Sequence, residues 1–143
     1  MFGNDTSYVG EDRIKRIRMD NDFKDLTFVV KSNEFKVNKT LMAASCDYFK
    51  TMLYGNTNES RMSTIELKST PKVAFEKVVE FIHNDKCDVD SIEEKNLIDL
   101  IGLSHEYQFS HLLQYLYNEL DCEDKEFSVD FYIRLFDLSI EKQ

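Results

Sequence analysis

The sequence contains no Trp, one Pro and only four Gly among its 143 residues. A turn-rich β-sandwich and a glycine-rich phosphate loop both require more of these residues, so neither is expected. The three cysteines, Cys46, Cys87 and Cys122, are scattered and lack any Cys-x-x-Cys spacing. An odd, scattered set indicates reduced thiols rather than a disulfide framework. We therefore expect the protein to reside in the cytoplasm or the nucleus.

Basic charge and long apolar runs are also scarce. The chain has 18 Lys and Arg against 27 Asp and Glu, a formal net charge of −9, with no long basic tract. Nucleic-acid binding depends on cations that neutralise phosphates, so it is not expected. No run reaches the roughly 18 apolar residues of a membrane span, so we expect no membrane partner. Hydrophobic residues nevertheless make up 42%, enough for the core of one domain.

No pattern of metal-binding or catalytic residues stands out. His83 and Cys87 have the spacing of helical neighbours, but no third or fourth ligand lies nearby. Asp88 and Asp90 resemble the start of a calcium loop that lacks the required Gly. Cys46 is expected within a helix in apolar surroundings, which is typical of an inert thiol. We therefore predict no catalytic residue, no metal and no cofactor, and a binding module rather than an enzyme.

The N-terminal part of the sequence predicts a helix followed by a β-hairpin. Residues 1–10 are polar and are expected to be a loose lead-in, and residues 13–18 have the apolar spacing of a short amphipathic helix. Residues 26–30 alternate as a strand does, residues 32–33 suit a tight turn, and residues 34–37 alternate again.

The rest of the chain is mostly helical. After Asn38, a helix-capping residue, apolar residues recur at helical spacings up to Gly55, with Ser45 suited to begin a second short helix. Residues 64–67 predict a third strand, and Thr70-Pro71 marks the start of the next helix. Three more helices are expected, ending near residues 107, 120 and 140. This order predicts an α+β fold, mostly helical, in which a cluster of short α-helices flanks a three-stranded sheet.

Three segments carry a resemblance to a known family. The chain closely resembles the opening of BTB/POZ domains in Asp25-Leu-Thr-Phe-Val-Val, Glu34-Phe-Lys-Val-Asn-Lys and Leu41-Met-Ala-Ala-Ser-Cys-Asp-Tyr-Phe-Lys-Thr-Met-Leu-Tyr-Gly. The likeness extends in register over about residues 20–121 and implies the BTB/POZ fold. Within the family, the chain is most similar to the branch of BTB domain-containing protein 9, in which a helical BACK region follows the BTB domain.

The resemblance divides the chain into three parts. Residues 1–19 correspond to a lead-in and a dimerisation helix, residues 20–121 to the BTB/POZ core, and residues 122–143 to an acidic linker and the start of a BACK-like helical region. The apolar stripe over residues 129–140 has nothing left to pack against within the chain, which fits the first helix of such a region.

The resemblance also implies a homodimer. In such BTB domains the first helix packs against the early helices of the partner, and a charged pair lies in a groove at the interface. The matching positions here are Ile14, Ile17, Met19, Asp25, Lys39, Thr40, Ala43 and Ala44. The stripe formed by Ile14 and Ile17 has no obvious partner within its own subunit, which agrees with this expectation.

A second partner is implied by the same resemblance. Many BTB proteins with a BACK region bind the N-terminal domain of cullin-3 and act as substrate adaptors of RING ubiquitin ligases. The family contact is a hydrophobe-any-Glu motif, which matches Thr57-Asn58-Glu59, and a Tyr is common where His83 stands. The matching contact residues are Phe49, Met52, Leu53, Tyr54, Asn56, Thr57, Asn58, Glu59 and His83. The substrate protein is expected to bind outside this chain.

An alternative function is left open by the sequence. The domain could serve as a dimerisation scaffold, or recruit partners as BTB transcriptional repressors do, without binding cullin. Thr57 offers a single methyl group where Met or Leu would bury more, and each CH₂ is worth about 0.8 kcal/mol. A groove that uses Asp25, Lys39 and the dimer seam would serve this alternative.

Overall fold

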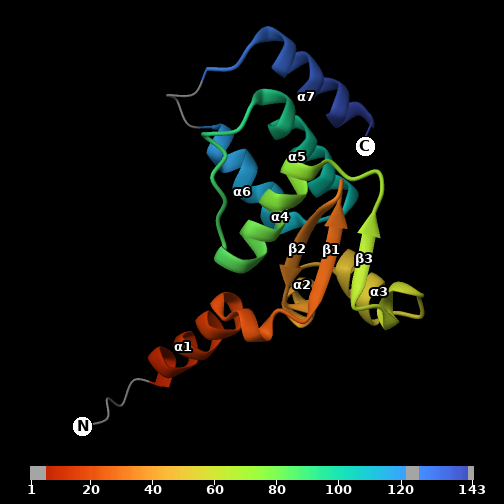
Figure 1. Cartoon of the computed structure of the whole chain (residues 1–143). Coiled ribbons are helices and arrows are strands. Elements are labelled where there is room, and N and C mark those ends of the chain that lie inside the picture. The colour runs from red at the N-terminus through yellow and green to blue at the C-terminus, as the bar shows by residue number, and fades with distance from the viewer. Residues whose placement is uncertain (1–5, 122–125, 142–143) are drawn as a thin grey trace.

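The computed structural model of the chain describes residues 6–121 and 126–141. The predicted α+β architecture is confirmed, with a three-stranded sheet and a larger set of helices (Figure 1). In chain order the elements are α1 (Thr6–Met19), η1 (Asn21–Phe23), β1 (Leu26–Val30), β2 (Asn33–Val37), α2 (Lys39–Ser45), α3 (Asp47–Tyr54), η2 (Glu59–Arg61), β3 (Thr64–Leu67), α4 (Lys72–Asn84), α5 (Glu94–Glu106), α6 (Ser110–Leu120) and α7 (Val129–Glu141).

The sheet is built around β1, the most apolar of the three strands. β1 pairs antiparallel with β2 and parallel with β3, so the strand order is β2-β1-β3. Phe28 lies opposite Phe35 on one side and Ile65 on the other. The parallel pairing requires a crossover connection, which α2, α3 and η2 supply. The predicted strands over residues 26–30 and 64–67 are therefore both confirmed.

The hairpin turn differs by one residue from the prediction. Val30 pairs with Asn33, so the two turn residues are Lys31 and Ser32 rather than residues 32–33. Both have positive φ, 50° and 67°, as a turn that follows the right-handed twist of the strands requires. Asn33 stabilises the turn from outside it, because its side-chain nitrogen donates to the Lys31 carbonyl at 2.8 Å.

Aromatic contacts join the sheet to the helices on either side. Phe28 lies edge-on to Phe49 of α3, at 6.0 Å between ring centroids, and to Phe75 of α4, at 5.2 Å. All three side chains are fully buried. Figure 1 shows α4, α5 and α6 gathered at one end of the sheet with α7 outermost, while α1 projects away from the opposite end.

Two helix starts were predicted one residue too early. Cys46, with φ −158° and ψ 152°, separates α2 from α3, whereas the Ser45 hydroxyl stays in α2 and donates to the Leu41 carbonyl. Cys46 is therefore an extended residue between helices, and its predicted place within a helix was wrong. Pro71 is the residue before α4 rather than its first residue, and no side chain caps that helix.

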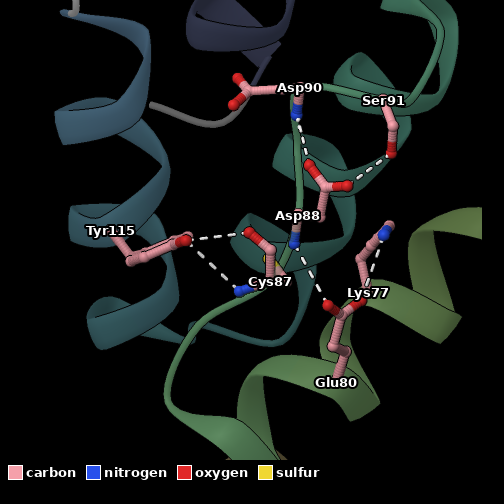
Figure 2. A network of polar contacts seen from close by, with 7 residues as sticks. All are labelled: Lys77, Glu80, Cys87, Asp88, Asp90, Ser91 and Tyr115. Atoms are coloured by element: carbon pink, nitrogen blue, oxygen red, sulfur yellow. Dashed lines mark hydrogen bonds and ion pairs between the residues drawn. The ribbon is translucent and has the colours of Figure 1, made fainter.

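The lead-in and the acidic loops also differ from expectation. Residues 6–10, predicted to be loose, belong to α1, and the predicted linker residues 122–125 lie outside the described residues. The loop after α4 is anchored to α6, because the Tyr115 hydroxyl donates to the Cys87 carbonyl at 2.9 Å and accepts from its amide (Figure 2). Cys87 and Val89 are buried while Asp88 lies exposed between them, so the loop is only half solvated.

Gly55 is required where α3 ends. A Cβ at this position would lie 2.3 Å from the Thr51 carbonyl oxygen, which the Gly55 amide approaches to 2.9 Å. We expect Gly55→Ala to lower the free energy of unfolding by about 1–3 kcal/mol, because backbone atoms must shift to accept the methyl group. Urea denaturation followed by circular dichroism measures the change.

Gly102 within α5 provides the matched control. A Cβ there meets only the Leu138 side chain of α7, at 3.6 Å, which is an ordinary contact. Gly102→Ala should leave the protein equally stable or stabilise it by about 0.5–1 kcal/mol, since Ala favours helices over Gly. Equal losses of stability in the two variants would contradict the role given to Gly55.

Candidate protein-interaction surfaces

The first candidate surface is the apolar edge of α1. Ile14, Ile17 and Met19 are 49%, 36% and 58% exposed, although each is a residue type that normally seeks a core. α1 meets its own subunit mainly at its C-terminal end, where an Arg18 guanidinium nitrogen lies 2.8 Å from an Asp85 carboxylate oxygen beyond α4. Ile14 and Ile17, which are one helical turn apart, form the apolar edge of α1, and this edge is held in place and left uncovered; Met19 lies on another side of the helix.

The charged pair predicted beside α1 takes a different form. The Asp25 carboxylate accepts from the backbone amide of Lys39 at 2.8 Å, at the start of α2, rather than from its ammonium group. The Lys39 ammonium donates to the Ser60 carbonyl at 3.0 Å and lies 4.8 Å from the ring centroid of Tyr54. A carboxylate at a helix start is stabilised by the free amides there, and this local interaction replaces the predicted side-chain pair.

The small residues of α2 divide between surface and core. Thr40 and Ala44 are exposed, and the Thr40 hydroxyl lies 2.9 Å from the Tyr54 hydroxyl. Ala43 is buried, so its predicted place at an interface is not available to its side chain in this structure. Of the predicted interface residues on α2, Thr40 and Ala44 are exposed and Lys39 is partly exposed.

His83 lies inside the domain beneath the α1 attachment. It is 6% exposed, and its Nε2 accepts from the Asn38 amide at 3.4 Å while its Nδ1 lies 2.9 Å from the Val79 carbonyl. Both contacts fit a neutral imidazole with its proton on Nδ1. Burial lowers the pKa of His83, and the nearby cations Lys24 and Arg18 lower this pKa further, against the raising effect of the Val79 carbonyl.

The second candidate surface is a groove of about 430 Å³ along α3. We name it the α3 groove, and its lining residues are Asp47, Tyr48, Thr51, Met52, Glu59 and Gln108. Met52 and Glu59 were predicted as contact residues, and the other four were missed. Neighbours on a helix point about 100° apart, so a fully buried Phe49 already implied an outward Tyr48.

Tyr48 gives the α3 groove an aromatic wall. Its ring packs against Tyr107 at 4.5 Å and lies edge-on to Phe49 at 5.5 Å, yet the side chain remains 37% exposed. Burial, followed by the charge of Glu106, raises the pKa of Tyr48, so its hydroxyl stays protonated at neutral pH. Together with Met52 and the carboxylates of the groove, this makes an apolar surface with an acidic edge.

The predicted cullin contacts separate into core and surface residues. The side chains of Phe49 and Leu53 are fully buried and that of His83 nearly so, so the prediction that they touch a partner directly does not fit this structure. They instead support the surface from inside. The predicted residues that remain at least partly accessible are Met52, Tyr54, Asn56, Thr57, Asn58 and Glu59.

Thr57 has an internal role that the sequence motif did not reveal. Its hydroxyl donates to the Met52 carbonyl at 2.7 Å and accepts from the Ser60 amide at 3.2 Å. The Ser60 hydroxyl in turn donates to the Thr57 carbonyl at 2.7 Å. These bonds satisfy a free carbonyl near the end of α3 and fix the loop before η2, which a larger apolar residue could not do.

Other features that could serve a function are groups of metal ligands, membrane-spanning helices and reactive cysteines. Over residues 6–121 and 126–141, no three His, Cys, Asp or Glu side chains are grouped as metal ligands, and no helix is long and apolar enough to cross a membrane. Cys46 and Cys87 are free thiols. Burial raises the pKa of Cys46 and raises that of Cys87 to about 12, so both stay protonated at neutral pH.

Comparison with known proteins gives a consistent result. The sequence profile of the BTB/POZ domain matches residues 14–124. BTB/POZ domain-containing protein 9 of Homo sapiens is 29% identical over 109 residues, which are 76% of this chain and 18% of the human protein. Kelch-like protein 9 of Mus musculus is 29% identical over 102 residues, 70% of this chain and 16% of that protein. The predicted similarity to the branch of protein 9 is thus confirmed.

The fold comparison agrees with the sequence comparison. The solved BTB domain of zebrafish PATZ1 superposes with a TM-score of 0.66, covering 84% of this chain and 98% of that domain, at 14% sequence identity. At so low an identity the superposition supports the fold alone. The predicted fold class is confirmed by it.

The burial of His83 predicts a pH dependence of stability. An exposed His in the unfolded chain titrates near pH 6.5, whereas the pKa of His83 in the folded protein is lower. As the pH falls below that value, proton uptake favours the unfolded chain, so the free energy of unfolding decreases. Urea denaturation should give a lower free energy of unfolding at about pH 5.5 than at about pH 7.5, and His83→Gln should reduce this difference.

His111, an exposed residue at the start of α6, provides the control. His111→Gln should keep the pH dependence of the unmodified protein. If His83→Gln kept it in full as well, the neutral buried imidazole would not be its source.

Proposed function

Because this chain belongs to the BTB/POZ domain family, we propose that it is a homodimeric adaptor that brings a substrate protein to a cullin-3 RING ubiquitin ligase. Domains of this family are protein-interaction and dimerisation modules. The chain spans 18% of the human relative, so recognition of the substrate is assigned to sequence outside residues 1–143. Each candidate surface is assigned one partner. The edge of α1 binds a second copy of the chain, and the α3 groove binds cullin-3.

The homodimer is supported by the uncovered edge of α1. Exposed apolar side chains on one side of a fixed helix mark an interaction site, and Ile14 and Ile17, one helical turn apart, form such an edge. In a two-fold dimer the same patch occurs on both copies. We assign this edge to the early helices of the partner copy, where the exposed Thr40 and Ala44 leave room for close approach.

The α3 groove is the observation that carries the cullin-3 proposal. The family contact lies in the loop after α3, and here Glu59 borders a groove whose wall contains Tyr48 and Met52. Tyr and Met are enriched at protein interfaces, where they bury a large apolar area. Asp47 and Glu59 give the groove an acidic edge that favours a partner with basic residues around an apolar contact.

A scaffold without cullin binding is the second candidate function, and Thr57 favours it. The Thr57 hydroxyl is used inside the loop, so this position adds no large apolar side chain to the α3 groove. The dimer would then be the whole contribution of this domain, and partners would bind at its seam. Only the cullin-3 proposal requires the α3 groove to be occupied.

The last helix supports the proposal that a BACK-like region begins here. α7 packs against α5 through the buried Phe131 and the partly buried Leu135 and Leu138. Its opposite face is more than half exposed although strongly apolar, and consists of Val129, Tyr132, Ile133, Phe136 and Ile140. A helix that is apolar on both faces belongs inside a helical bundle, so we assign the outer face to the following helices of a BACK-like region.

Charge placed on the edge of α1 should separate the dimer. We expect the double variant Ile14→Lys, Ile17→Lys to elute as a monomer. Dimerisation would have to bury two lysine charges from each copy, and their desolvation is costly. Size-exclusion chromatography with light scattering measures the mass. Lys15→Glu, an exposed change elsewhere on α1, should leave the mass unchanged. A double variant with the mass of the unmodified protein would contradict the assignment of this edge.

Changes in the α3 groove should remove binding to cullin-3 without affecting the dimer. Isothermal titration of the N-terminal domain of cullin-3 into this protein should give heat, and Glu59→Lys with Met52→Ala should abolish it. Glu76→Lys, an exposed change on α4, is the matched control and should bind normally. Absence of heat with the unmodified, dimeric protein would reject the cullin-3 proposal and favour the scaffold.

A further inference from the structure

A third surface lies where four segments meet at the far end of the molecule from α1. It is a groove of about 460 Å³ between the β1–β2 turn, the first turns of α4 and α5, and the middle of α7. Figure 1 shows β1 and β3 both pointing toward this end, with α5 and α7 beyond it. We name it the basic groove, and its charged lining residues are Lys31, Lys72, Lys95, Arg134 and Asp99.

Positive charge dominates this groove although the chain as a whole carries a formal net charge of −9. The three lysines are exposed, and none of them is ion-paired with a carboxylate among the residues that the structure describes. Arg134 is paired with Asp130 through Nε at 2.9 Å, and Asp99 is the one carboxylate in the lining. Among the residues that line the groove, three unpaired lysines face one carboxylate, so the lining itself is positively charged; Glu93 and Glu94 lie at the adjoining hollow beyond Lys95.

The surroundings of the lysines reinforce this charge. Lys72 begins α4, a helix of 13 residues whose first turn has no side-chain cap and carries partial positive charge on its amides. Pro71, Val73 and Ile98 add apolar surface beside the lysines. The lining of the groove therefore combines cations with apolar side chains, which suits the binding of a peptide.

We propose that the basic groove binds a short acidic peptide segment of a partner protein. Its volume is in the range of roughly 300–1,000 Å³ that holds a compact ligand or a few residues of a peptide. Charges are screened beyond about 8 Å at physiological salt, so a short segment is affected mainly by the charges in and directly beside the groove. A long polyanion such as a nucleic acid would also meet the acidic remainder of the surface, which repels it.

The basic groove is independent of the two surfaces already described. None of its lining residues belongs to α1 or to the α3 groove. Failure of dimerisation or of cullin-3 binding therefore leaves this inference standing, and the reverse also holds.

Fluorescence anisotropy with a labelled hexapeptide of alternating Asp and Glu tests the inference. The unmodified protein should bind this peptide, and Lys72→Glu with Lys95→Glu should weaken the binding about tenfold or more, because two attractions become repulsions. Lys36→Glu with Lys86→Glu makes the same charge change at exposed sites outside the groove and should weaken it much less. Raising the salt concentration should weaken the binding of the unmodified protein.

Two further measurements separate the other outcomes. A single-stranded oligonucleotide of the same charge should bind more weakly than the peptide, and tighter binding of the oligonucleotide would overturn the proposal. In an NMR titration of the unmodified protein, the peptide should shift the amide signals of Lys31, Lys72 and Lys95. Absence of peptide binding, shifts elsewhere only, or equal losses in the two double variants would also overturn it.

Discussion

Asn38 is the polar junction on which the arrangement of the domain depends. Its side-chain oxygen accepts from the Leu41 amide at 2.7 Å and caps α2, while its side-chain nitrogen donates to the Phe23 carbonyl at 2.7 Å. Its backbone amide donates to His83 in α4, and its carbonyl accepts from Met42. Asn38 is buried, and a buried polar atom without a hydrogen-bond partner is costly. The four bonds of Asn38 therefore stabilise the positions of η1, α2 and α4 relative to one another.

This junction fixes the position of the first candidate surface, the apolar edge of α1. The bond to Phe23 holds η1, and through it the end of α1, against the start of α2. The direction of α1 relative to the domain is therefore fixed, and its apolar edge is exposed before any partner binds. A surface fixed before binding loses little conformational entropy when a partner arrives. Two different surfaces lie beyond the other end of the sheet, the basic groove and the outer face of α7.

Local patterns in the sequence predicted the helices and strands. The features that these patterns missed depend on contacts that the patterns do not contain. Alternation placed β1 correctly because the strand buries one face, and the short strand predicted over residues 64–67 is β3. The turn moved to Lys31 and Ser32 because pairing across the hairpin sets its position. His83 could not be assigned to the interior from sequence, since its partner amide at Asn38 lies 45 residues away. The family motif pointed to the loop after α3, in which Glu59 borders the α3 groove, but the motif did not reveal that Thr57 bonds within the loop to Met52 and Ser60.

The central claim is that a second copy covers the apolar edge of α1. Hydrogen–deuterium exchange of residues 6–19, measured over a range of protein concentrations, tests it most directly. Exchange in α1 should slow as the concentration rises, while exchange in β1 stays constant, because α1 gains protection from association and β1 is protected within its own subunit. Exchange in α1 that is rapid and independent of concentration would contradict the account.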